Sequence, residues 1–349
     1  MLPVALREAL TARVLRDTVG LGPLEDLLAD PLVEEVMVNG PGAVYVERAG
    51  RVEPTAVSFP DEAALRDAIE RILAPLGRRV DEASPMADAR LADGSRVNVV
   101  IPPLALEGPV LSIRRFGSIR PSLDELAGRG ALAPEARDLL EELVAARRSV
   151  LVSGGTGAGK TTLLNALSGS LDPAERVVTI EDAAELRLQQ PHVVRLESRP
   201  PNVEGRGAVT IRDLLRNALR MRPDRIVIGE VRGPEALDLV TALNTGHRGA
   251  LSTVHANSPS DALRRLETLA LMAGIGLPHA AVREQVLRGI DAVAHVERAP
   301  DGARRVVAVA EVGGGRGGSP VELLYRWPGW EQREQGDDGE GGEAWGGSR

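Results

Sequence analysis

The sequence predicts an α/β protein in which a mainly parallel sheet, covered by helices on both faces, follows a smaller α+β domain. Two observations support this prediction. Between residues 134 and 312, short apolar runs alternate with helical stretches, as in a parallel sheet covered on both faces. A glycine-rich segment ending in a lysine, residues 154–161, separates one of these runs from the next helix. The 349 residues are 43% hydrophobic, which is enough for two domains with separate cores.

The N-terminal domain is expected to cover residues 1–117. Apolar residues recur at helical spacing in two segments, and alternating apolar runs around Asn39-Gly40-Pro41-Gly42 indicate strands joined by a turn. Pro60-Asp61-Glu62 is typical of a helix start. The expected helices are 4–15, 24–28 and one beginning at 60. The expected strands are 36–38, 44–47, 89–101, interrupted by a turn at Ala92-Asp93-Gly94, and 110–116.

Residues 118–133 are expected to form a linker with one small helix, because Pro121, Gly128, Gly130 and the adjacent Pro134 interrupt regular structure. The main α/β domain follows at 134–312. Its expected strands are 150–153, 176–180, 193–196, 226–228, 250–253, 292–296 and 306–312. Residues 313–349 are expected to be a mostly disordered tail, rich in glycine and acids, with one short apolar segment at 321–327.

Residues 154–161 fit the phosphate-binding pattern G-x-x-x-x-G-K-[ST]. The glycines let successive backbone N–H groups turn toward one anion, and the following helix directs its positive end at the phosphates. Lys160, the only lysine among 42 basic residues, adds a full charge between the β and γ phosphates, and Thr161 offers a hydroxyl to Mg²⁺. The predicted residues for ATP are Gly154, Gly155, Thr156, Gly157, Ala158, Gly159, Lys160, Thr161 and Thr162.

Two expected strands end in acids. Residues 225–230 end in Glu230, which we expect to orient or deprotonate the water that attacks the γ-phosphate. Gly229 stands where such strands usually have an aspartate, so this position has no metal ligand. Residues 177–182 end in Glu181 and Asp182. Either these acids or Glu185 supply the missing carboxylate near Mg²⁺, or they mark a helix N-terminus, which favours negative charge.

Histidines and arginines leave alternatives open. His247 and His255 flank an expected strand, and each is either a γ-phosphate contact or an ordinary packed or surface residue. Four arginines between 212 and 222, including Arg220, fit a solvated helix face. The alternative is that one of them neutralises transition-state charge, in its own or a neighbouring subunit. Arg114 and Arg115 are candidates to close onto the nucleotide from the N-terminal domain.

Composition excludes several classes. The absence of cysteine excludes disulfides and thiolate metal sites. A net charge of -8, a pI near 5.4 and 2% aromatic residues argue against direct nucleic-acid binding. No apolar run approaches the length of a transmembrane helix, and residues 1–10 do not resemble a secretory signal, so any membrane role is expected to come through a partner.

Four segments occur in a recognisable order: SGGTGAGKTT, TIEDAAEL, RPDRIVIGEVRG and TGHRGALSTVHANSP. Together they resemble the secretion ATPases of type II and type IV systems, and in particular the CpaF/TadA group, which powers tight-adherence pilus assembly. The stretch DARLADGSRVNVVIPPLALEGPVLSIRRF is also similar to that group. The likeness covers roughly residues 20–312. The absence of cysteine excludes the tetracysteine zinc module of many general secretory-pathway ATPases, which favours the pilus branch or a relative. The acidic tail is not expected from the resemblance and is assigned no role.

The resemblance implies a hexameric ring of RecA-like P-loop ATPase cores, with ATP and Mg²⁺ held between the two domains of each subunit. It places Glu181 and Asp182 in an acidic box at the metal, Glu230 in the Walker B motif, and His247 and His255 in a histidine box. It also makes nucleotide contacts of Arg114, Arg115 and Arg220. The implied catalytic residues are Lys160, Glu181, Glu230, His255 and Arg220, and the implied metal-site residues are Thr161, Glu181, Asp182 and Glu230.

The resemblance further implies a cytoplasmic motor, peripheral at the inner membrane and docked on polytopic membrane proteins. Two alternatives remain at this point. One is a nucleic-acid translocase. The other is a nucleotide-gated assembly scaffold with little turnover, which the glycine at position 229 allows.

Overall fold

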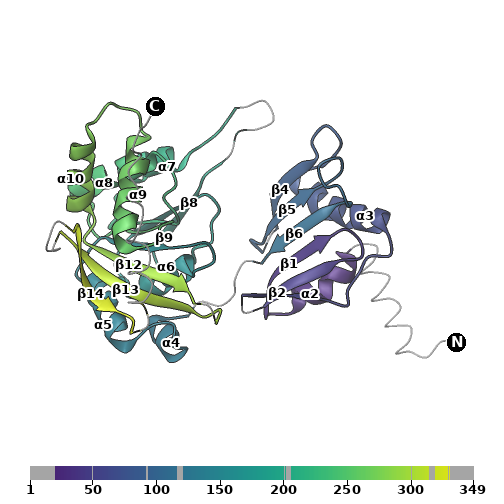
Figure 1. Ribbon diagram of the computed structural model, residues 1–349. Coiled ribbons are helices and arrows are strands. Elements are labelled where there is room, and N and C mark those ends of the chain that lie inside the picture. Colours follow the sequence, from purple (N-terminus) through teal and green to yellow (C-terminus); the bar gives the residue numbers. More distant parts are fainter. Residues whose placement is uncertain are drawn as a thin grey trace, which may run out of the picture. The chain divides into compact units, whose positions relative to one another are not determined.

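The chain divides into two compact units, Met1–Ile119 and Arg120–Arg349. The computed structural model describes residues 20–48, 50–91, 93–115, 121–199, 201, 206–299, 301–313, 319–328 and 330. The helix expected at 4–15 and the end of the expected tail, 331–349, lie outside the described residues. Figure 1 shows both units as ribbons.

The first unit is an antiparallel sheet with helices packed against it. Its strand order is β3-β2-β1-β6-β5-β4. The α3 helix begins after Asp61, whose carboxylate accepts a hydrogen bond from the Ala64 N–H, and it buries Leu65, Ile69 and Leu73 in the core of the unit. The elements are η1 Gly22–Leu24, α2 Glu25–Ala29, β1 Val33–Asn39, β2 Val44–Arg48, β3 Arg51–Pro54, α3 Glu62–Leu73, η2 Ala74–Leu76, β4 Met86–Arg90, β5 Arg96–Val100 and β6 Val110–Arg114.

The second unit contains an eight-stranded sheet of order β14-β13-β12-β7-β11-β10-β8-β9. The strands from β12 to β9 are parallel to one another, and β13 and β14 pair antiparallel at one edge. The strands are β7 Val150–Gly154, β8 Val177–Glu181, β9 Val193–Glu197, β10 Arg225–Ile228, β11 Leu251–Val254, β12 Ala292–Arg298, β13 Arg304–Val312 and β14 Val321–Arg326. The central strands are buried on both faces, which fits their nearly continuous apolar sequences.

Helices cover both faces of this sheet, as Figure 1 shows. One face packs against α4 Leu123–Gly128, α5 Pro134–Ala145 and α6 Lys160–Ser168. The other packs against α7 Ile211–Ala218, α8 Glu235–Asn244, α9 Pro259–Leu271 and α10 His279–Gly289. In the described part of the chain, no helix is both long and apolar enough to cross a bilayer.

Part of the segment expected to be a linker, residues 118–133, is packed into this second unit. Leu123, Leu126 and Leu132 are buried in the same cluster as residues of α5, α6 and β7. The α4 helix that carries the first two begins with a capping box between Ser122 and Glu125. Proline and glycine here lie at the ends of a helix. The segment is packed and not a free linker, because its leucines cover apolar surface of the main core.

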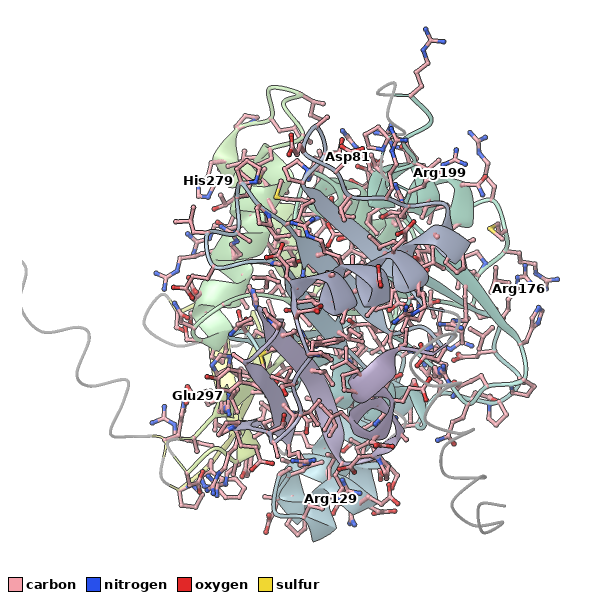
Figure 2. The ribbon with its side chains drawn as sticks, turned by 90° about the vertical axis from the view of Figure 1, so that its right-hand side faces the viewer. Asp81, Arg129, Arg176, Arg199, His279 and Glu297 are labelled. Atoms are coloured by element: carbon pink, nitrogen blue, oxygen red, sulfur yellow. The ribbon has the colours of Figure 1, made fainter. Side chains whose placement is uncertain are left out.

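The C-terminal segment expected at 321–327 continues the sheet. The strand β14 pairs with β13, and Trp327 and Trp330 then pack against Val307 and Ala308. The indole N–H of Trp330 donates to a carboxylate oxygen of Glu297 at 2.8 Å. Glu297, labelled in Figure 2, lies on β12. This part of the expected tail is therefore a strand that pairs at the sheet edge.

Candidate nucleotide-binding site

The phosphate loop leaves the carboxyl end of β7, the buried strand between β12 and β11. Gly154 is required by a close approach, because a Cβ there would overlap the carbonyl oxygen of Val296 on β12. Gly159, with φ +101°, takes a backbone conformation that side chains disfavour and directly precedes α6. The loop thus has its tight turn next to a helix N-terminus, an arrangement suited to an anion.

Lys160 is the first residue of α6, and its side chain turns back into the loop. The Nζ atom donates to the carbonyl oxygens of Gly154 and Gly155, both at 3.0 Å. Burial lowers the pKa of Lys160 to about 8, with the positive charge of Arg232 adding to the fall and the negative charge of Glu230 opposing it. Among the described residues, no carboxylate forms an ion pair with this ammonium. A buried cation satisfied only by neutral carbonyls is electrostatically prepared for an anionic ligand.

The neighbouring parallel strands bring three more predicted residues to this edge. Glu181 is the last residue of β8, Glu230 follows β10 by two residues, and His255 follows β11 directly. Because β7, β11, β10 and β8 are consecutive in the sheet and parallel, their carboxyl ends lie in one row. The sequence prediction that these groups surround the loop fits this arrangement.

Glu230 forms a small polar cluster with its neighbours. One oxygen, Oε1, lies 3.6 Å from Nδ1 of His255, and the other accepts a hydrogen bond from the guanidinium of Arg232. Burial lowers the pKa of His255, and the charge of Lys160 lowers it further, against the opposing effect of Glu230. The imidazole is therefore neutral at pH 7, so it can act as a hydrogen-bond donor or acceptor beside the carboxylate.

Glu181 has one satisfied oxygen and one unsatisfied oxygen. Its Oε1 accepts from the N–H groups of Glu185 and Leu186, each at 2.8 Å. Its Oε2 is buried and has no hydrogen-bond partner among the described residues. Burial raises the pKa of Glu181 to about 7, although the two N–H groups and the charge of Arg195 act in the opposite direction. An unpaired, buried carboxylate oxygen at this edge is a suitable ligand for a hard cation.

The position of Glu181 also explains Gly229. A Cβ at residue 229 would lie only 2.9 Å from Cγ of Glu181. The Glu181 side chain therefore occupies the space that a side chain after β10 would need. The carboxylate missing from position 229 is present in the same region, supplied by the adjacent strand β8.

The donor set fits Mg²⁺ bound together with phosphate. The hydroxyl of Thr161, on a half-buried residue of α6, and Oε2 of Glu181 are the kind of oxygen ligands that Mg²⁺ takes, with water and phosphate completing the shell. Asp182 is exposed, and its carboxylate accepts a hydrogen bond from the Ser198 hydroxyl at 3.1 Å. In the described ranges, no cluster of three or more His, Asp or Glu side chains forms a metal site of its own.

Two predicted residues lie at the amino ends of the parallel strands, away from the phosphate loop. His247 precedes β11, in the loop where Gly249 N–H donates to Ser149 Oγ at 3.1 Å, just before β7 begins. Arg220 is exposed and follows α7, ahead of the start of β10. Both therefore lie at the amino ends of the parallel strands, and the structure does not bring them to the phosphate loop of their own chain.

The remaining predicted arginines belong to the first unit. Arg114 is exposed at the end of β6, with Glu35 and Arg96 as its cross-strand partners. The guanidinium of Arg115 donates to the carbonyl oxygens of Asp30 and Val33, the latter at 3.2 Å. Arg115 thus has partners within its own unit, and Arg114 is the arginine with its side chain toward solvent.

Two residues beside the loop carry no signal in the sequence analysis. Arg232 binds Glu230, as described above. Arg304, at the start of β13, places Cδ 3.5 Å from the position that a Cβ on Gly159 would occupy. It lies 144 residues after Lys160 in the chain, so no local motif indicates it.

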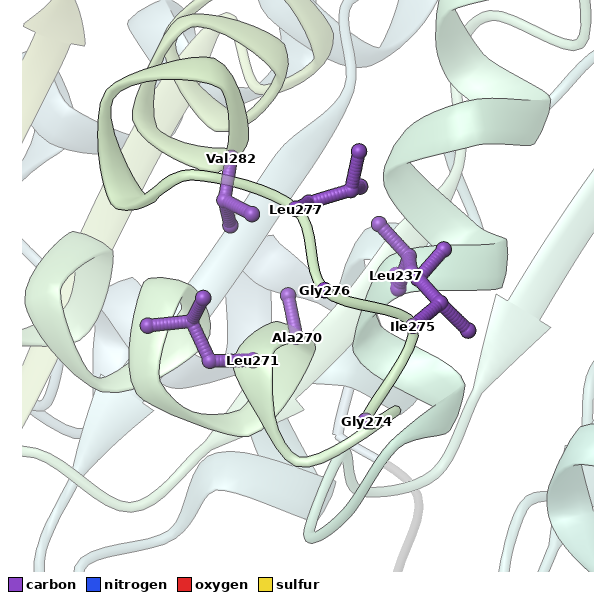
Figure 3. A pocket seen from close by; sticks show the side chains of 8 residues that line it. All are labelled: Leu237, Ala270, Leu271, Gly274, Ile275, Gly276, Leu277 and Val282. Carbon is purple, nitrogen blue, oxygen red and sulfur yellow. The ribbon is translucent and has the colours of Figure 1, made fainter.

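A separate apolar hollow of about 340 Å³ lies between α8, α9 and the loop that joins α9 to α10. Figure 3 shows its lining, which is entirely aliphatic or glycine: Leu237, Ala270, Leu271, Gly274, Ile275, Gly276, Leu277 and Val282. It contains no group that can donate or accept a proton from its side chains, so it is not the chemical site.

A phosphate loop between the central strand and a helix, with acids after the neighbouring parallel strands, defines a P-loop protein with a RecA-like core, here preceded by an α+β unit. The chain belongs to the family of Type II/IV secretion system proteins, whose model matches residues 17–298.

Individual relatives agree with this membership. A putative conjugal transfer protein of Mycobacterium tuberculosis is 44% identical over 305 residues, covering 85% of this chain and 86% of the relative. The type IV secretion system protein PtlH of Bordetella pertussis is 41% identical over 306 residues, covering 79% and 88%.

Two solved structures share the fold. The pilus retraction motor PilT, solved with bound ADP, is 19% identical, covers 90% of this chain and 86% of its own, and superposes with a TM-score of 0.58. The ATPase DotB of Yersinia pseudotuberculosis is 17% identical, covers 82% and 77%, and has a TM-score of 0.60. The expected fold class, a RecA-like core with an N-terminal domain, is confirmed.

Proposed function

We propose that this protein binds Mg·ATP at the phosphate loop and hydrolyses it. The observation that carries the proposal is Lys160: a buried ammonium within a glycine loop, held by two carbonyl oxygens and lacking a described counter-ion. Burying such a charge is unfavourable unless a ligand neutralises it. Polyphosphate is the ligand that suits the loop N–H groups, the helix N-terminus and the ammonium together.

Each residue has a role in this proposal. The loop N–H groups and Lys160 hold the phosphates, with Thr162 at the start of the helix. Thr161 and Glu181 hold the metal, with Asp182 and Glu230 acting on it through water. When bound, magnesium would supply positive charge to the β and γ phosphates. Glu230 orients the attacking water and accepts its proton. His255, whose neutral imidazole carries one N–H, offers a hydrogen bond to the γ-phosphate.

We further propose that ATP hydrolysis drives a secretion or tight-adherence pilus assembly system of the CpaF/TadA kind. Family membership and relatives named for secretion, conjugal transfer and pilus retraction support this view. In this proposal the protein is a hexamer at the cytoplasmic face of the inner membrane and works on polytopic membrane partners. Of the two arginines proposed as nucleotide contacts in the first unit, Arg114 is exposed and available, whereas Arg115 would first have to leave the carbonyls of Asp30 and Val33. Arg220 and His247, remote from their own loop, serve the nucleotide of a neighbouring subunit.

The test is ATP turnover by the purified protein, compared with Glu230→Gln and Lys160→Ala. We expect Glu230→Gln to keep nucleotide affinity and to lose turnover by roughly 10²–10⁴-fold, the usual contribution of a general base. Lys160→Ala should lose both. Equal turnover in wild type and Glu230→Gln would remove Glu230 from the mechanism, and negligible wild-type turnover with intact binding would favour the nucleotide-gated scaffold.

The same assay with added DNA addresses the translocase alternative. An acidic chain with few aromatic residues is expected to show no stimulation. Strong stimulation by single- or double-stranded DNA would replace the secretion motor with a nucleic-acid translocase.

A further inference from the structure

We infer that Arg304 is a further nucleotide-binding residue, which contacts the phosphates from the side of the loop opposite Glu230. The inference rests on the proposed function and extends it to a part of the chain that carries no recognised motif. In the sheet, β12 and β13 lie on one side of β7, whereas β11, β10 and β8, which bring His255, Glu230 and Glu181, lie on the other. Arg304 would therefore complete the phosphate site from its second side.

The hairpin between β12 and β13 fixes this placement. The strand β12 runs parallel to β7, with Val296 paired to Gly154, so the chain continues alongside the phosphate loop. The hairpin then closes with the Ala299 N–H donating to the carbonyl of Ala303 at 2.8 Å. Directly after this closure, the aliphatic stem of Arg304 lies over the loop, with Cβ at 3.8 Å and Cδ at 3.5 Å from the Cβ position of Gly159.

The loop itself supplies only one cationic side chain. Within the loop, Lys160 is the only charged side chain, while a nucleotide di- or triphosphate carries several negative charges. The loop residue under Arg304 is the glycine that precedes Lys160 and has φ +101°. A guanidinium presents a planar set of N–H donors that matches phosphate oxygens, and such charge-assisted bonds are stronger than neutral ones.

The adjacent arginine provides a matched control. Successive side chains of a strand point to opposite faces, so Arg305 faces away from Arg304. Arg305 binds the carboxylate of Asp301 at 2.8 Å, and its guanidinium lies 5.7 Å from the ring centre of Trp327. Both arginines lie on β13 and carry the same charge. The stem of Arg304 lies over the loop, whereas Arg305 stabilises the hairpin and the C-terminal segment.

The experiment measures the affinities of Mg·ADP, Mg·ATP and inorganic tripolyphosphate by calorimetry for wild type, Arg304→Gln and Arg305→Gln. Glutamine keeps most of the stem and removes the charge. We expect Arg304→Gln to weaken all three ligands by about 10- to 100-fold, the effect of one hydrogen bond to a charged group. Arg305→Gln should bind within about twofold of wild type, because it lies on the other face.

Three results would overturn the inference. The first is Arg304→Gln binding like wild type while Lys160→Ala loses binding, because the loop then works without Arg304. The second is weakened nucleotide affinity with unchanged tripolyphosphate affinity, which would exclude the phosphate contact. The third is equal losses in both arginine variants together with equal falls in melting temperature, which would make the effect structural. Failure of wild type to bind any of the ligands would overturn the proposed function itself.

Discussion

Buried charges are paired at the amino ends of the parallel strands of the main sheet and unpaired at their carboxyl ends. At the amino edge, Arg225 at the start of β10 is 2% exposed and Glu175 is 4% exposed. The guanidinium donates to Glu175 at 2.8 Å and to the carbonyls of Gly249 and Val144 at 3.0 and 2.8 Å, and Arg147 binds the second oxygen of Glu175 at 2.5 Å. At the carboxyl ends of the strands, Lys160 and Glu181 are also buried, at 8% and 3% exposed, but neither has an oppositely charged partner among the described residues.

This difference distinguishes a structural charge from a ligand-binding one. A buried ion pair whose every hydrogen bond is made holds elements together and leaves nothing for a ligand. A buried ammonium whose pKa has fallen to about 8, and a buried carboxyl whose pKa has risen to about 7, both mark places where the charged form lacks a partner. The comparison therefore identifies the nucleotide site from electrostatics, independently of the glycine pattern.

The largest expected effect comes from breaking the satisfied edge. Arg225→Met leaves Glu175 buried, with only the half-exposed Arg147 as a counter-ion. We expect the free energy of unfolding to fall by about 3–5 kcal/mol, as in other buried pairs that lose one member. Urea denaturation measures it. A loss below about 1 kcal/mol would show that this edge is not held together by the pair.

At the carboxyl ends of the strands, the matched substitution Lys160→Met should reduce activity without reducing stability. Lys160→Met removes a buried charge that has no counter-ion, so the unfolding free energy should stay the same or rise. ATP turnover should fall by roughly 10²–10³-fold, the usual effect of removing one donor to the transition state. Urea denaturation and a phosphate-release assay measure the two quantities. Destabilisation similar to that of Arg225→Met would erase the distinction between the edges.

The pKa of Lys160 sharpens the comparison with pH. Because the free protein has a pKa of about 8 at this residue, below the ordinary value of 10.5, the ammonium is lost as pH rises through 8. Bound phosphate favours the charged form, so ATP affinity should be level below pH 8 and then fall by up to about tenfold per pH unit.

Stability should follow the opposite sign. Between pH 8 and 10.5 the unfolded chain holds a proton on this lysine that the folded chain has released, so this group makes the ligand-free protein more stable as pH rises. Calorimetric titrations and urea denaturation at pH 7 to 9.5, with Lys160→Met as the control, separate this lysine from other titrating groups. The variant Lys160→Arg keeps its charge over this pH range. If it binds ATP and its affinity falls with pH in parallel with that of wild type, the assignment to Lys160 is contradicted.

The smallest effect concerns Gly229. A methyl group there must displace the Glu181 side chain, since Cγ lies 2.9 Å from the Cβ position. We expect Gly229→Ala to raise the Mg²⁺ concentration needed for half-maximal turnover by about tenfold, the lower range for disturbed metal-ligand geometry. Gly128→Ala, on α4 and outside the phosphate loop, is the control, because nothing lies within 4 Å of its Cβ position. An unchanged Mg²⁺ requirement in Gly229→Ala would remove Glu181 from the metal site.

Strand direction explains how much of the site the sequence could predict. Glu181 ends a strand, and Lys160, Glu230 and His255 follow one. In a parallel sheet such residues gather at the carboxyl ends of the strands. His247 precedes a strand, so it lies at the other edge, although both histidines flank the same strand in the sequence. The order of each histidine relative to the strand could be predicted from the sequence. Grouping both histidines in one motif led to the expectation that they lie together.

Other features depend on contacts between distant segments. Arg304 reaches the loop through a hairpin that local patterns do not connect to it. The relation between Gly229 and Glu181 depends on the register of β8 against β10, which pairs Ile228 with Ile180. The strands from β7 to β13 were predictable, because each is a short, largely apolar run. The strand β3 was not expected, because its exposed sequence Arg51–Pro54 lacks that pattern. The packed α4 was expected only as a small helix in a linker, since prolines and glycines indicate where chains turn and not what their leucines cover.

The pairing of β14 with β13 has a practical consequence for anyone preparing shorter versions of this chain. Ending the protein at residue 312, the expected end of the α/β domain, would remove the strand that pairs with the outer side of β13 and leave backbone N–H and C=O groups of β13 open to solvent. It would also uncover the apolar surface that Trp327 and Trp330 protect. Such an edge is a template for intermolecular pairing, so truncates should extend at least to residue 330 if they are to stay in solution at high concentration.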